Sequence, residues 1–148
     1  MKRFYFIITL LVLSSCSTVP KPVNYGEDVC AFCRMTIVDN QHAAQLVTEK
    51  GKNYKYDAIE CMINDLNSWK RPPVKYHLVS DYASPGVMTD ALSASYLISE
   101  EIPSPMGAFL SAFSSESERN RTHASAGGDK LSWEQLRKSW GEKHTHNH

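Results

Sequence analysis

The chain has 148 residues, a length that allows one domain or two very small ones. Its formal net charge is zero, and its charged residues are scattered rather than gathered in a basic stripe, which argues against a nucleic-acid partner. No serine–histidine–aspartate elbow, glycine-rich phosphate loop or acid/base carboxylate pair is evident, so we expect no enzyme of the hydrolase or kinase type.

The first 15 residues have the layout of a secretory signal peptide. Two basic residues precede an apolar run over residues 4–13, which is too short for a bilayer core that needs roughly 20 residues. The run ends in Leu13-Ser-Ser-Cys16, which resembles a bacterial lipobox. We therefore predict a lipoprotein anchored to a membrane of the cell envelope through Cys16, facing the periplasm or the exterior. The alternative is a secreted protein in which Cys16 is lost or incidental.

Residues 16–27 are predicted to form a tether, because they contain two prolines and no apolar period. Removal of Lys2 and Arg3 with the signal leaves 14 basic residues against 16 acidic ones, a net charge of −2. If Cys16 carries lipid, three cysteines remain. An odd number cannot all pair within the chain in an oxidising compartment, so at least one thiol is free or occupied.

After the tether we predict strands over 35–38, 43–48 and 54–56, followed by a helix. Asp57 and Glu60 have the spacing of a capping box at the start of that helix. Its apolar residues recur at intervals of three and four, which places them on one stripe: Ile59, Met62, Ile63, Leu66 and Trp69. Two consecutive prolines then stop the helix.

A second passage repeats this order. We predict strands over 76–82 and 96–98, a helix over 106–113, and a loop or mobile segment over 114–128. Ser132 with Gln135 predicts another capping box, which opens a last amphipathic helix. Strands followed by a helix, twice, predict an α+β fold of two small related ββα-type units, forming one domain over residues 28–141.

The Cys30-x-x-Cys33 pair has three interpretations: metal chelation, a redox disulfide or neither. The strand predicted after it disfavours a thioredoxin-like site, in which the first cysteine opens a helix. Structural zinc needs four ligands, and the sequence contains no second pair of this kind.

Cys33-x-Met35 favours the metal. In a strand, residues two apart share a face, so the thiol and thioether would converge. Sulfur ligands of this kind select soft ions, Cu(I) above all. The alternative is that Met35 is an ordinary core methionine.

Cys61 and Met106 are further candidate ligands. Cys61 lies outside the apolar stripe of its helix and in the first turn, where the helix dipole favours a thiolate. Its alternative is a disulfide with Cys30 or Cys33. Met106 stands between two prolines and a glycine, which could present its thioether rigidly or anchor a loop through a buried side chain.

The histidines are weaker candidates. His42 follows the Cys/Met strand closely and could supply a nitrogen ligand. The tail over 142–148 contains His144, His146 and His148, a pattern that can bind Cu(II), Ni(II) or Zn(II) but that, as a flexible end, is by default solvated.

Four ordered blocks together resemble the NosL family, the nitrous oxide reductase accessory lipoproteins. The blocks are Cys30-Ala-Phe-Cys33-Arg-Met35, Tyr54 to Met62, Val79 to Tyr82, and Ser104-Pro-Met106-Gly107 with Ala112-Phe113. They extend from Cys30 to about Trp140, nearly the whole mature chain.

The resemblance implies a lipoprotein that binds Cu(I) and hands it on for assembly of the copper sites of nitrous oxide reductase. Its partner would be a membrane transporter complex or the apo-reductase, and its fold would be similar to that of organomercurial lyase. By position, Cys33 and Met35 match the family's Cys-x-Met, Met106 its Met-Gly, and Cys61 the cysteine of the second block.

Two positions depart from the family's pattern and leave the ligand set and the client open: Arg34 stands where many members have glycine, and Ala58 where many have a second aspartate. The alternative functions are a thiol-disulfide oxidoreductase that uses Cys30 and Cys33, and a lipid-anchored structural or interaction domain with no metal.

Overall fold

The computed structural model describes the backbone of residues 18–145 and the side chains of residues 18–141. The predicted signal peptide, Cys16 and the side chains of the histidine tail therefore lie outside the described residues. Within the described part of the chain, no helix combines the length and the apolar character needed to span a membrane.

The first unit contains a four-stranded antiparallel sheet and one helix. β1 (Ala44–Thr48) and β2 (Asn53–Tyr56) form a hairpin that leads into α1 (Ile59–Asn67). β3 (Val74–Ser80) returns to pair with β1, and β4 (Met88–Asp90) pairs with β3, which gives the order β2-β1-β3-β4.

The second unit contains a three-stranded antiparallel sheet and two helices. β5 (Ser95–Ile98) and β6 (Leu110–Phe113) form the hairpin, followed by α2 (Glu116–Ala126) and β7 (Asp129–Leu131). β7 pairs with β5, which gives the order β6-β5-β7. The final helix, α3 (Trp133–Thr145), follows directly.

The two units share one topology. Each has an antiparallel hairpin, then a helix, then a strand that pairs antiparallel with the first strand of the hairpin. The predicted α+β fold of two related ββα-type units is therefore confirmed. The second unit, however, begins at Ser95 and not at Val74, because the strand over 74–80 belongs to the first sheet.

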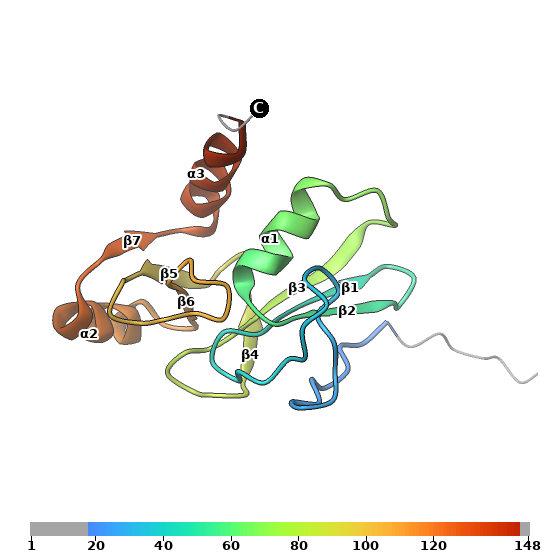
Figure 1. The fold of residues 1–148 in the computed structure, drawn as a ribbon, viewed down its shortest axis with the longest axis horizontal. Helices are drawn as coiled ribbons and strands as arrows, with labels where there is room; N and C mark the ends of the chain where they lie inside the picture. The colour runs from blue at the N-terminus through green and yellow to red at the C-terminus, as the bar shows by residue number, and fades with distance from the viewer. Residues whose placement is uncertain (1–17, 146–148) are drawn as a thin grey trace, which may run out of the picture.

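Helices α1 and α3 join the two units around the main hydrophobic core (Figure 1). A smaller cluster lies within the second unit. The apolar stripe of α1 is buried against residues of both sheets, including Leu46 and Leu110. α3 is fastened to α1 by two hydrogen bonds. The Arg137 guanidinium donates to the carbonyl of Ile63 at 3.2 Å, and the Trp140 indole donates to Asn64 Oδ1 at 3.0 Å.

Residues 106–113, predicted as a helix, are a turn followed by strand β6. All four residues of β6 are buried. In a short, fully buried strand, apolar and polar residues do not alternate. Periodicity therefore cannot distinguish such a strand from a segment of buried helix.

Residues 114–128, predicted as a loop or mobile segment, contain helix α2. This helix has almost no apolar face, and Arg119 is its only buried residue. It is defined by its ends: the Ser115 hydroxyl accepts a hydrogen bond from the Ser117 N–H at 3.2 Å, and Gly127 takes a positive φ of 65° at the far end. Hydrophobic patterning therefore could not find it.

The two predicted capping boxes had different outcomes. At α3 the box is formed, because Ser132 and Gln135 exchange hydrogen bonds of 2.8 and 3.3 Å. At α1 the prediction was wrong: Ala58 is the N-cap and no side chain caps the helix. Glu60 instead accepts hydrogen bonds from Ser104 and Ala108.

Candidate metal centre

The Cys-x-x-Cys motif lies at the tip of a loop that folds back on itself over residues 26–37. The Gly26 N–H donates to Ile37 O at 2.8 Å, the Ile37 N–H donates to Asp28 O at 2.9 Å, and the Cys30 N–H donates to Met35 O at 2.8 Å. Between these bonds, residues 31–33 form a turn.

The predicted strand over 35–38 was therefore wrong, since only Thr36 makes a bridge, with Val29. Arg34, at a φ of 68°, reverses the chain immediately before this segment. Cys33 and Met35 flank that reversal, and the argument that they share the face of a strand does not apply.

Three thiols meet where this loop covers the start of α1. The Sγ atoms of Cys30, Cys33 and Cys61 all lie within 4.8 Å of one another. Cys30 and Cys61 are fully buried, and Cys33 is partly exposed. All three are free thiols, so the predicted alternative of a disulfide to Cys61 is not what the structure contains.

Hydrogen bonds make Cys30 the anionic member of the cluster. The Cys61 thiol donates to its sulfur and, together with the backbone N–H groups of Asp57, Cys33 and Phe32, lowers the pKa of Cys30 to about 5 against the cost of burial. The shared hydrogen bond and burial raise the pKa of Cys61, and burial raises that of Cys33. At neutral pH the cluster therefore holds one thiolate and two thiols.

A buried carboxylate adds to the negative character of this region. Asp57 is only 2% exposed, and its Oδ1 has no hydrogen-bond partner among the described residues. Burial, and then the charge of Cys30, raise the pKa of this carboxyl group. Because two anionic groups lie close together in a poorly solvated place, a bound cation would stabilise both.

The spacing of the sulfurs suits a three-coordinate ion. With metal–sulfur bonds of about 2.3 Å, the corners of a trigonal site lie roughly 4 Å apart. The cluster meets that distance with small adjustments. Three sulfur donors favour a soft ion such as Cu(I), whereas structural zinc takes four ligands.

The two predicted methionine ligands are on the surface. The side chain of Met35 is 56% exposed and that of Met106 is 43% exposed. Met35 is thus not a core methionine, and Met106 is not the buried anchor of its loop. Met106 lies in a turn closed by a 3.0 Å hydrogen bond from the Gly107 N–H to Ser104 O. Their roles as thioether ligands stay predictions.

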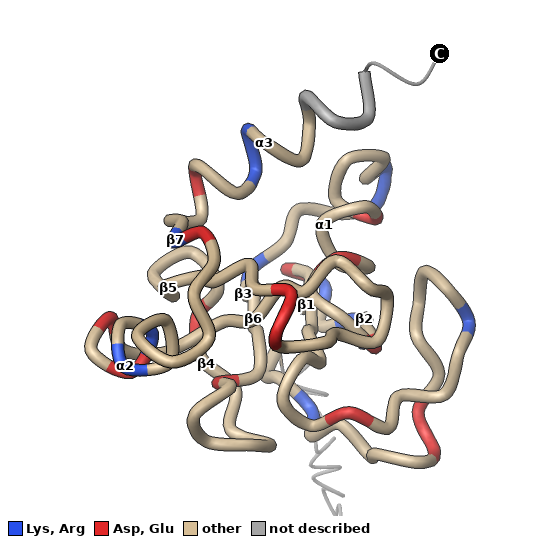
Figure 2. The backbone as a smooth tube through the Cα atoms, turned by 60° about the vertical axis from the view of Figure 1, so that its left-hand side comes forward, with Lys and Arg blue, Asp and Glu red and all other residues tan. Residues whose placement is uncertain are grey.

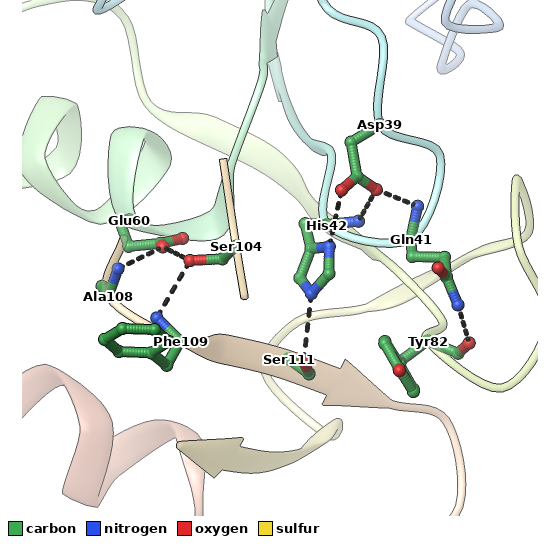
Figure 3. Close-up of polar contacts among 9 residues, drawn as sticks. All are labelled: Asp39, Gln41, His42, Glu60, Tyr82, Ser104, Ala108, Phe109 and Ser111. Carbon is green, nitrogen blue, oxygen red and sulfur yellow. Dashed lines mark hydrogen bonds and ion pairs between the residues drawn. The ribbon is translucent and has the colours of Figure 1, made fainter. Parts of the chain in front are cut away.

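His42 is engaged elsewhere. Its Nδ1 lies 2.9 Å from Asp39 Oδ2 and its Nε2 lies 3.1 Å from Ser111 Oγ, so neither ring nitrogen is available to the thiol cluster (Figure 3). Asp39, His42 and Ser111 thus lie in the order of a catalytic triad, which the sequence did not reveal. Ser111 is completely buried in β6, where a substrate has no access, so the chain of bonds serves to join the two units.

Glu60 is a second residue that sequence reasoning misjudged. This buried carboxylate on α1 accepts hydrogen bonds from the Ser104 hydroxyl and, at 3.3 Å, from the Ala108 N–H (Figure 3). Ser104 Oγ in turn accepts from the Phe109 N–H at 3.0 Å. One carboxylate thus ties the helix of Cys61 to the loop of Met106. Glu60 lies beside the apolar stripe of α1 rather than on it, so the sequence carried no clear signal that this carboxylate would be buried.

Comparisons with known proteins agree with this description. A family model described as NosL matches residues 23–140. In the solved structures, the crystal structure of the copper chaperone NosL from Shewanella denitrificans superposes with a TM-score of 0.68 at 15% sequence identity, covering 80% of this chain and 96% of that chain. No curated protein matches the chain.

Proposed function

We propose that this chain, which belongs to the NosL family, is a carrier that binds Cu(I) and passes it to another protein. The observation that carries the proposal is the cluster of three free thiols within 4.8 Å. The structurally similar Shewanella protein is itself described as a copper chaperone. The family resemblance noted in the sequence supports the same ion.

The exposure of the cluster suits transfer better than storage. Cys33 is partly open to solvent, while Cys30 and Cys61 are buried beneath the loop. An incoming thiol or thioether can therefore reach the metal beside Cys33 first and displace the ligands one at a time. A closed four-ligand site would offer no such point of entry.

The finer proposal is that the protein is an extracytoplasmic lipoprotein, anchored through Cys16, that delivers copper for the copper sites of nitrous oxide reductase. The lipobox-like Leu13-Ser-Ser-Cys16 supports the anchor. The membership of the NosL family supports the client, either directly or through a membrane transporter complex.

A competition titration tests the copper proposal. Reduced protein without residues 1–15 should take one equivalent of Cu(I) from a coloured chelator, and the Cys30→Ser/Cys33→Ser/Cys61→Ser variant should take none. A variant with His144, His146 and His148 replaced by alanine is the matched control and should bind like the wild type. Equal binding by the triple-serine variant would refute the thiol site.

Proton release on binding counts the thiolates. Because the pKa of Cys30 is about 5, this residue has no proton to lose at neutral pH, whereas Cys33 and Cys61 have raised pKa values and must each lose one to bind as thiolates. We expect about two protons released per Cu(I) in weakly buffered solution containing a pH indicator. Release of one proton would mean that one of these two cysteines does not coordinate the ion.

A thiol-disulfide oxidoreductase is the second candidate, favoured by the low pKa of Cys30. The geometry opposes it, because the thiolate is fully buried and the more accessible Cys33 has a raised pKa. The anion is therefore shielded from a disulfide substrate. Turnover of a disulfide substrate, together with a reversible Cys30–Cys33 disulfide, would support the oxidoreductase function instead of the copper carrier.

A further inference from the structure

A groove with a strong excess of positive charge lies beside the thiol loop. Its volume is about 710 Å³. It lies between the loop over 26–37, the β1–β2 hairpin and the segment that precedes the loop. Its lining includes five basic side chains and a single carboxylate, that of Asp28: Lys21, Arg34, Lys52, Lys55 and Arg71.

Three of the five basic side chains have no acidic partner. Lys55 is paired with Asp28 and Arg71 with Asp65. For Lys21, Arg34 and Lys52, no carboxylate of the described residues lies within ion-pair distance. The surface elsewhere is mixed: helix α2 carries both signs, and its arginines are paired with its own glutamates (Figure 2).

Arg34 has a strained backbone conformation. Its φ of 68° lies in the left-handed region, where glycine is unstrained and a residue with a Cβ is not. A strained conformation retained by a charged, exposed residue motivates a functional explanation. The explanation available is the groove, which this side chain lines directly after Cys33 in the chain.

The groove and the metal cluster share one segment of chain. Val29, Ala31 and Arg34 line the groove, while Cys30 and Cys33, which alternate with them, belong to the cluster. The 2.8 Å hydrogen bond from the Ala31 N–H to Lys55 O fixes this segment against β2. Val29 and Phe32 are also exposed apolar side chains on this loop. Whatever binds in the groove is therefore held next to Cys33.

We infer that this groove is the docking site for an acidic segment of the protein that receives the metal. The inference rests on the proposed carrier function and names the chemistry of its partner. Carboxylates of the partner would pair with Lys21, Arg34 and Lys52, and the exposed apolar residues would contact the same partner. Complementary charge of this kind orients two proteins and accelerates their encounter.

Binding of a fluorescently labelled oligoglutamate peptide, followed by anisotropy, tests the inference. Copper-loaded protein without residues 1–15 should bind the peptide at low salt and lose it as salt is added. The Arg34→Gly/Lys52→Ala variant should bind it roughly tenfold more weakly, since two exposed charge pairs are removed. Lys138→Ala, which removes one charge from the exposed face of α3, should bind like the wild type.

Two further readouts separate this inference from the copper proposal. The double variant should keep the Cu(I) affinity of the wild type, and glycine at position 34 should leave the melting temperature unchanged or higher, since it relieves the strain. Loss of Cu(I) binding in the wild type would defeat the carrier function itself. Wild-type Cu(I) affinity without peptide binding would defeat only the docking site.

Competing ligands give the remaining outcomes. Binding to vesicles that contain phosphatidylglycerol, lost in the double variant, without any binding of the peptide would assign the groove to a lipid headgroup and overturn the inference. Displacement of the peptide by low concentrations of inorganic phosphate would assign it to a small anion, with the same consequence. Peptide binding that survives both competitors supports the docking site.

Discussion

Replacement of Cys61 by serine should weaken Cu(I) binding by a few hundredfold. Cys61 donates the hydrogen bond that does most to hold Cys30 as a thiolate, and its own sulfur lies within 4.8 Å of the other two. A four-ligand zinc site contributes about 10–16 kcal/mol, which is roughly 2.5–4 kcal/mol for each ligand. That loss corresponds to a factor of a few hundred in the dissociation constant.

The measurement is competition with a Cu(I) chelator at fixed pH. Met62→Leu is the matched control, because Met62 is the buried neighbour of Cys61 and the exchange nearly conserves volume. It should bind like the wild type. If Cys61→Ser also keeps the wild-type affinity while Cys33→Ser/Met35→Ala loses it, the ion is held by the Cys-x-Met pair predicted from sequence.

Replacement of Glu60 by alanine should lower the free energy of unfolding of the copper-free protein by about 2–4 kcal/mol. The buried carboxylate accepts from both the Ser104 hydroxyl and the Ala108 N–H, and alanine leaves both donors without that partner (Figure 3). Urea denaturation measures the loss. Glu101→Ala, at an exposed position in the connection between β5 and β6, is the control and should change stability by less than about 0.5 kcal/mol.

Glutamine at position 60 should have a different, pH-dependent effect. Burial raises the pKa of Glu60 above its ordinary value of 4.5, so the folded state binds more protons than the unfolded state above that pH. The wild type therefore loses stability as pH rises through this window, and Glu60→Gln, which cannot ionise, lacks this contribution. Relative to the wild type, the variant should be more stable at about pH 7 than at about pH 5.

The comparison isolates Glu60 because other buried acids, such as Asp57, are common to both proteins. A stability difference between wild type and Glu60→Gln that stays constant with pH would contradict a raised pKa. Loss of stability by Glu60→Gln equal to that of Glu60→Ala would show that a neutral acceptor cannot hold the 104–109 loop.

Elements with a clear alternation or a stripe were predictable from the sequence. Strands β2 and β3, helix α1 and helix α3 each place apolar residues at a regular interval or follow an unmistakable turn, and β1 is a short run that ends at the turn before β2. Two related units were predicted from strands followed by a helix, although the helix and the starting strand assigned to the second unit were both misplaced. The fully buried β6 and the almost entirely polar α2 have no such pattern, and the predictions of a helix over 106–113 and a loop over 114–128 were wrong.

The members of the thiol cluster were also identified from sequence, but not the reason that they meet. Cys30, Cys33 and Cys61 were named from residue type and spacing, since few other side chains bind soft metals. A strand over 35–38 was predicted to bring Cys33 and Met35 together, and the sequence offered no reason for the three thiols to meet. The structure brings the thiols together with a reversed loop, whose turn at Arg34 depends on backbone bonds to Met35 and Ile37.

The sequence alone thus determined the family, the α+β class and the sulfur-rich chemistry, because these depend on residue identity and local period. Tertiary structure decided which thiol is anionic, which is accessible and what Glu60, His42 and Arg34 do. Those properties depend on hydrogen bonds and burial between residues far apart in the chain, such as the bond from Ser104 to Glu60 and the contact between Cys30 and Cys61. These hydrogen bonds and burials cannot be predicted from a local sequence pattern, because they form only when α1, the thiol loop and the second unit pack together.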